Sequence, residues 1–135
     1  MSDEERAAFF AHIHRSIREA VGRAAASLGS GGPDLIYPPN SALIDDERAA
    51  LGTLGATPAL RSAFEKVAAD ATAAVLFDLF ALLDGVGDPA GFEGEWLGFR
   101  LARRAEADEE YEPMLHDEMF ESYWSSPTLS SDPLS

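Results

Sequence analysis

The fold is decided by one long apolar stretch, Pro58–Leu83, with the sequence PALRSAFEKVAADATAAVLFDLFALL. Thr57 is a suitable N-cap, and a proline in the first turn is typical of a helix that begins at this point. Apolar residues recur at three- and four-residue steps, and the second half is apolar on most sides, as in a helix at the centre of a fold. We therefore expect this helix to form the core around which the other helices pack.

Two further helices are predicted before this stretch. The first covers residues 3–28, where apolar residues form one stripe, and it begins with Ser2 and Glu5 at the spacing of a capping box. A loop rich in Gly and Pro follows at residues 30–41. The second helix is short, covers residues 45–54, and directs its leucines inward.

The segment after the long helix is predicted to add a minor β element. Residues 96–103 alternate apolar and polar side chains, which is the strand pattern, and residues 111–115 could supply a partner strand. A lone hairpin needs a surface to pack on, so it should lie on the helices. A short last helix is expected at 117–124. The predicted fold class is therefore mainly α, with one globular domain over residues 1–124 and a disordered Ser/Pro-rich tail over 125–135.

Composition restricts the compartment and the partners. The chain of 135 residues has 24 acidic residues against 10 Lys+Arg, a net charge of -14, and no cysteine. The acidic N-terminus differs from a secretory signal, and the most apolar run, residues 71–83, is too short to span a bilayer. A negative field also repels nucleic acid. We expect a soluble cytoplasmic protein that binds neither membranes nor nucleic acid and carries no cofactor.

The acidic C-terminal section, residues 105–135, is the most distinctive feature of the charge pattern. It holds nine of the acidic residues and neither Lys nor Arg. Such a surface attracts a basic partner, and this favours a non-enzymatic interaction protein of the inhibitor or immunity type. The alternative is that acidity only maintains solubility. The candidate binding residues are Glu106, Asp108, Glu109, Glu110, Glu112, Asp117, Glu118 and Glu121.

The same acidic section could instead satisfy the chain's own cations. Residues 3–28 carry four of the bases, Arg6, Arg15, Arg18 and Arg23. If the C-terminal section folded back on the first helix, these residues would form intramolecular ion pairs. Exposed pairs contribute only about 0–1 kcal/mol each, so apolar packing of Tyr123 and Trp124 would have to dominate the docking.

A metal-dependent function is the second hypothesis. Residues 84–95 have the length of a calcium loop, but Val86 and Pro89 occupy positions that need an oxygen ligand and a glycine, so a tight turn is the favoured interpretation. His116 and Glu121 are five residues apart, which is off the spacing of a zinc helix. A metal-binding protein or metal-assisted hydrolase would use Asp84, Asp88, His116, Asp117 and Glu121.

Motifs for nucleophilic catalysis and phosphate binding are absent from the chain. There is no cysteine, no Gly-x-Ser-x-Gly elbow and no Gly-x-x-x-x-Gly-Lys loop. His12 and His14 are two residues apart, so on a helix they point to different sides and cannot chelate one ion together. The sequence therefore favours a protein that is not an enzyme.

Overall fold

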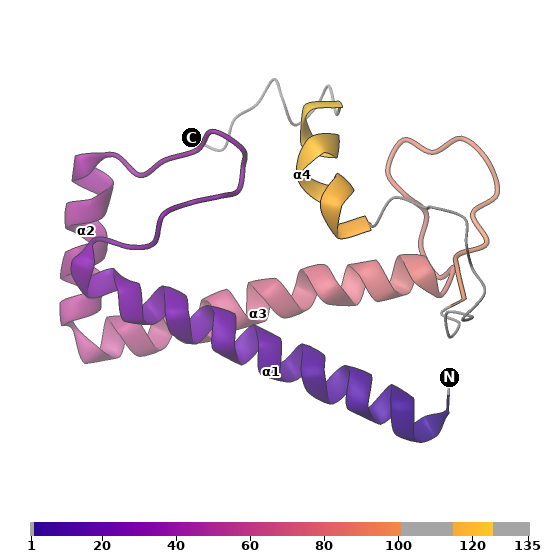
Figure 1. The fold of residues 1–135 in the computed structure, drawn as a ribbon, viewed down its shortest axis with the longest axis horizontal. Coiled ribbons are helices and arrows are strands. Elements are labelled where there is room, and N and C mark those ends of the chain that lie inside the picture. The colour runs from indigo at the N-terminus through magenta and orange to yellow at the C-terminus, as the bar shows by residue number, and fades with distance from the viewer. Residues whose placement is uncertain (1, 101–114, 126–135) are drawn as a thin grey trace.

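The computed structural model describes residues 2–100 and 115–125, and this part of the chain is helical. The elements are α1 (Asp3–Ser27), the 3-10 turn η1 (Leu28–Ser30), α2 (Asp45–Ala56), α3 (Pro58–Leu83) and α4 (Leu115–Ser125) (Figure 1). The mainly α class is confirmed. The described residues contain no β-strand: residues 96–100 are irregular, and the rest of the predicted hairpin, 101–103 and 111–114, lies outside them.

The beginnings of the first two helices follow from local hydrogen bonds. At α1 the Glu5 amide donates to Ser2 Oγ at 3.2 Å, and the Ser2 amide donates to Glu5 Oε2 at 2.8 Å, which confirms the predicted capping box. At α2 the Ile44 amide donates to Glu47 Oε2 at 2.9 Å. Both first turns are acidic, which suits the positive end of a helix dipole.

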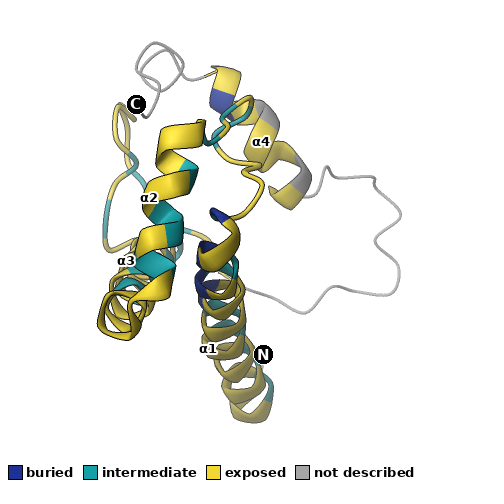
Figure 2. Cartoon of the chain, turned by 90° about the vertical axis from the view of Figure 1, so that its left-hand side faces the viewer, coloured by how far each residue is buried: buried dark blue, intermediate teal, exposed yellow. Residues whose placement is uncertain are grey.

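The small core lies where the end of α1 meets α2. Its buried apolar residues are Val21, Ala25 and Leu28, and Leu28 is only 1% exposed (Figure 2). Gly55 of α2 lies directly against this surface, since a Cβ added there would be 2.7 Å from the Leu28 Cβ. The absence of a side chain at Gly55 therefore allows α2 to approach η1 closely.

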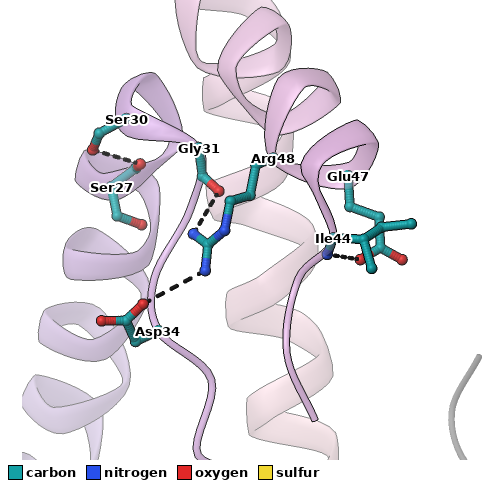
Figure 3. A network of polar contacts seen from close by, with 7 residues as sticks. All are labelled: Ser27, Ser30, Gly31, Asp34, Ile44, Glu47 and Arg48. Carbon is teal, nitrogen blue, oxygen red and sulfur yellow. Dashed lines mark hydrogen bonds and ion pairs between the residues drawn. The ribbon is translucent and has the colours of Figure 1, made fainter.

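The chain leaves this core through a left-handed turn that α2 holds in place. Gly31 has φ +91° and is buried, and its carbonyl accepts a hydrogen bond from Arg48 Nη1 at 3.4 Å (Figure 3). Arg48 Nη2 also lies 3.5 Å from Asp34 Oδ1. Because the Asp34 side chain is fully exposed, this ion pair adds little stability, and Arg48 acts mainly by satisfying the buried turn.

The expectation that the 58–83 helix lies at the centre of the fold is wrong. Its bounds are as predicted, but α3 has no buried residue, and Val67 and Val75 are each 69% exposed. One side of α3 meets α1 and α2, and residues 96–99 contact its carboxyl end, but much of its remaining surface faces solvent (Figures 1 and 2). The contact with α1 includes Phe80, whose ring packs edge-to-face on Phe9 and Phe10.

The last helix packs on the loop before α2 and not on α1. Tyr123 of α4 is buried, and its ring centroid is 5.7 Å from that of Tyr37. Phe120 also contacts Tyr37, at 6.3 Å between centroids. Within the described residues no ion pair joins α4 to the arginines of α1. The other carboxylates of the fold-back hypothesis, those of residues 106–112 and of Asp117 and Glu121, lie outside the described part, so that hypothesis is untested. The described contacts of α4 are aromatic and involve Tyr37.

The glycines of α2 provide a test of this core. We expect Gly55→Ala to be less stable than Gly52→Ala by about 1–3 kcal/mol, because its Cβ would overlap Leu28, whereas the nearest atom at Gly52 is 4.0 Å away. Both changes gain the same helix propensity, so their difference isolates the packing. Urea unfolding followed by circular dichroism measures it. Equal stabilities would contradict the close approach of α2 to η1.

Candidate functional site

The structure describes only part of the predicted acidic surface. Residues 106–112 lie outside the described part, as do the side chains of Asp117 and Glu121. Glu118 is exposed on α4. Helical spacing puts positions 118 and 121 on a side of α4 away from the buried Tyr123. The described carboxylate therefore faces solvent, as the interaction hypothesis requires.

Apolar side chains share the exposed surface of α4 with this acidic residue. Leu115 is 83% exposed, Trp124 is 51% exposed, and Met119 is also exposed. Leu115 and Met119 are one turn apart on the same side of α4, whereas helical spacing puts Trp124 on the opposite side, near the carboxyl end. Aromatic residues and methionine are enriched at protein interaction sites. The charge pattern of the sequence indicated the acidic component. The apolar component was not predicted, because the last helix was expected only from residue 117, which left the exposed Leu115 outside it.

The predicted metal ligands do not gather in the described part of the chain. No group of three or more His, Asp or Glu side chains there could hold an ion. Asp84 is the C-cap of α3, and its amide donates to the Phe80 carbonyl at 2.8 Å. Gly85 follows with φ +71°, and the Val86 amide bonds to the Ala81 carbonyl at 2.9 Å. The start of the proposed calcium loop is thus a helix-ending turn, as the favoured interpretation predicted.

A groove of about 840 Å³ lies where the first turns of α1, the last turn of α3 and residues 97–100 meet. One wall is aromatic: Phe9, Phe10 and Phe80 contact one another edge-to-face, with centroids 5.4–6.0 Å apart. Phe99 lines the groove from the loop. Edge-to-face contacts of this kind hold the rings in defined orientations.

The loop wall of the groove is fixed to the carboxyl end of α3. The Phe99 amide donates to the Leu83 carbonyl at 2.7 Å, and Trp96 Nε1 donates to the Leu82 carbonyl at 2.8 Å. Gly98 has φ +75° and touches the Leu83 carbonyl so closely that a Cβ would not fit. Helix-terminal carbonyls lack partners within the helix, so the loop satisfies them and is itself held in position.

The groove has the opposite charge character to the chain as a whole. Among the described residues that line it are Arg6 and Arg100, together with one carboxylate, that of Asp84. Neither arginine side chain forms an ion pair or hydrogen bond with another described residue. No local sequence signal predicts this arrangement, because Arg6 and Arg100 lie far apart in the sequence and come to line one groove only in the folded chain.

Comparison with known proteins gives no further assignment. No family model, curated protein or solved structure matches the chain. None of the helices in the described ranges is long and apolar enough to cross a bilayer. The functional inferences therefore depend on the surfaces of α4 and of the groove.

The indole hydrogen bond of Trp96 predicts an asymmetry between the two tryptophans. Trp96→Phe keeps an aromatic ring but removes the donor to the Leu82 carbonyl, so we expect a loss of about 0.5–1.5 kcal/mol of unfolding free energy. Trp124→Phe is the control, because Trp124 is half exposed, and its effect should stay within about 0.5 kcal/mol. Chemical denaturation measures both. A larger loss for Trp124→Phe would contradict the loop anchor.

Proposed function

We propose that this protein is a non-enzymatic interaction module whose acidic C-terminal section engages a basic partner, in the manner of an inhibitor or immunity protein. The observation that carries this proposal is the surface of α4, where exposed Leu115 and Met119 lie within about one turn of the exposed carboxylate of Glu118, and exposed Trp124 lies near the carboxyl end of the same helix. No Lys or Arg of the described residues pairs with that carboxylate. Both components of a mixed interface are therefore accessible to a partner.

The charge distribution favours a cationic partner. Residues 105–135 contain nine acidic residues and no Lys or Arg, so no side chain of this section except His116 could carry a positive charge that repels a positive protein. Such fields raise association rates by roughly 10–10³-fold, and the gain falls as salt is added. At physiological ionic strength the Debye length is about 8 Å, so the charges act mainly near contact. Charge thus selects and steers the partner.

Apolar contacts would supply the affinity that remains when salt screens the charges. Aromatic side chains are frequent at the energetic centre of interfaces, where they fill pockets on the partner. Trp124 is half exposed and packs on the buried Tyr123, with centroids 5.2 Å apart. This packing presents the indole in one orientation, which reduces the entropy lost on binding.

The proposal predicts that binding of a basic partner depends on where the acidic residues lie and not only on the net charge of the chain. One variant converts the eight candidate acids to Asn or Gln: Glu106, Asp108, Glu109, Glu110, Glu112, Asp117, Glu118 and Glu121. Its matched control, with the same net charge, converts eight exposed acids that have no hydrogen bond or ion pair to another described residue: Asp3, Glu19, Glu65, Asp70, Asp78, Asp88, Glu93 and Glu95.

Binding to immobilised poly-lysine and to a small cationic protein is then measured at about 20 mM and about 500 mM salt. We expect the first variant to lose roughly tenfold or more in affinity at low salt, and the control to lose roughly threefold or less. High salt should reduce the difference. Equal losses for the two variants would overturn the proposal, because total charge alone would then explain the binding.

A thermal scan with divalent ions separates this proposal from a metal-dependent function. A saturable site for Ca²⁺, Mg²⁺, Mn²⁺ or Zn²⁺ would add about 2.7 kcal/mol of stability at a hundredfold excess over Kd. We expect no such rise in Tm, because the described residues contain no group of three ligands. A saturating rise with any one ion would favour the metal-dependent function instead.

A further inference from the structure

We infer that the groove between α1, α3 and residues 97–100 is a binding site for a small monocarboxylate with an apolar, preferably aromatic, body. Its volume of about 840 Å³ lies within the range of roughly 300–1,000 Å³ typical of small-molecule sites. This site is distinct from the acidic surface of α4 and does not depend on the proposed function.

The aromatic wall determines the body of the ligand. Phe9, Phe10 and Phe80 meet edge-to-face and Phe99 lines the groove opposite the helices, so an inserted ring would find ring faces and edges at contact distance. Phe10 and Phe99 remain exposed in this structure. Burying their exposed surface against an apolar body would therefore remove apolar area from water, which favours binding.

The two arginines determine the head group. Arg6 on α1 and Arg100 at the end of the loop line the same groove, and neither is engaged by a described carboxylate. A guanidinium binds a carboxylate through charge-assisted, often bidentate, hydrogen bonds. Asp84 also lines the groove, so the described lining residues carry a net charge of +1, and this favours one negative charge over a dianion such as phosphate.

The loop wall is already formed before any ligand binds. Two hydrogen bonds to the Leu82 and Leu83 carbonyls hold residues 96–99, and the close contact of Gly98 with the Leu83 carbonyl leaves the loop little freedom to move. A preformed wall spares the ligand the entropic cost of ordering the loop. The site thus combines a defined shape, an apolar surface and two arginines that no described carboxylate engages.

Three probes with the same body and different head groups test this inference on the full chain: 3-phenylpropionate, 3-phenylpropan-1-ol and 3-phenylpropylamine. Binding is measured by titration with NMR detection of the Gly98 and Phe99 amides. We expect the carboxylate to bind roughly tenfold more tightly than the alcohol, and the amine to bind most weakly. Octanoate, as a second carboxylate, reports whether the body must be aromatic, and we expect it to bind more weakly than 3-phenylpropionate.

Variants assign the binding to the groove. Arg6→Ala and Arg100→Ala should each reduce the carboxylate preference by roughly threefold or more and leave alcohol binding unchanged. Arg18→Ala is the matched control, because Arg18 is an exposed arginine of the same helix that does not line the groove, and it should have no effect. Phe99→Ala, at an exposed position, should weaken all three probes together.

Several outcomes would overturn the inference. These are equal binding of carboxylate and alcohol, equal effects of Arg6→Ala and Arg18→Ala, tighter binding of octanoate than of the aromatic acid, and no saturable shift at the Gly98 and Phe99 amides. None of these measurements involves a basic partner, so they leave the proposed function of α4 untouched.

Discussion

The burial of Leu28 against α2 determines how the helices of the described chain are arranged. Leu28 is the C-cap of α1 and the first residue of η1, and burying a leucine side chain completely contributes about 1.5–3 kcal/mol. After Leu28 the chain turns at the buried Gly31, and the hydrogen bond from Arg48 of α2 to the Gly31 carbonyl holds this turn against α2 (Figure 3). Because α2 ends at Ala56 and α3 begins at Pro58, the position of α2 on Leu28 also determines where α3 crosses α1. That crossing brings Phe80 to Phe9 and Phe10, and so creates the aromatic wall of the groove.

Local chemistry allowed the helix boundaries to be predicted from the sequence. The capping box of Ser2 and Glu5 and the proline at Pro58 act within a few residues, so their meaning does not depend on the fold. The predicted strand is not formed over residues 96–100, the part of it that the structure describes, and the reason is the opposite one. Trp96 and Phe99 donate to the carboxyl end of α3 rather than to a neighbouring strand, and only the tertiary structure brings these partners together. The groove could not be predicted for the same reason, since Arg6 and Arg100 line one groove only after the chain has folded.

The role of α3 was wrongly predicted although a relevant signal was present. The apolar stripe of α3 shows which residues share a side of the helix, but it does not show which side is covered. Asp78 lies in the middle of the exposed side, one turn from Val75. A helix buried on all sides would have to bury this carboxylate without a partner, at a cost of several kcal/mol. The charge of Asp78 therefore favours an arrangement in which this side of α3 faces solvent.

The surplus of acidic residues also affects contact between copies of this chain, whatever partner the protein binds. Many large apolar side chains are exposed in the described residues, among them Val67, Val75 and Phe77 of α3. Exposed apolar surface of this extent promotes association. A net charge of -14 opposes contact between copies, because each copy repels the next, and Asp70 and Asp78 place part of that charge on α3 itself. The same repulsion does not act on a cationic partner. Charge thus allows apolar surface to remain exposed while favouring contact with proteins of opposite sign.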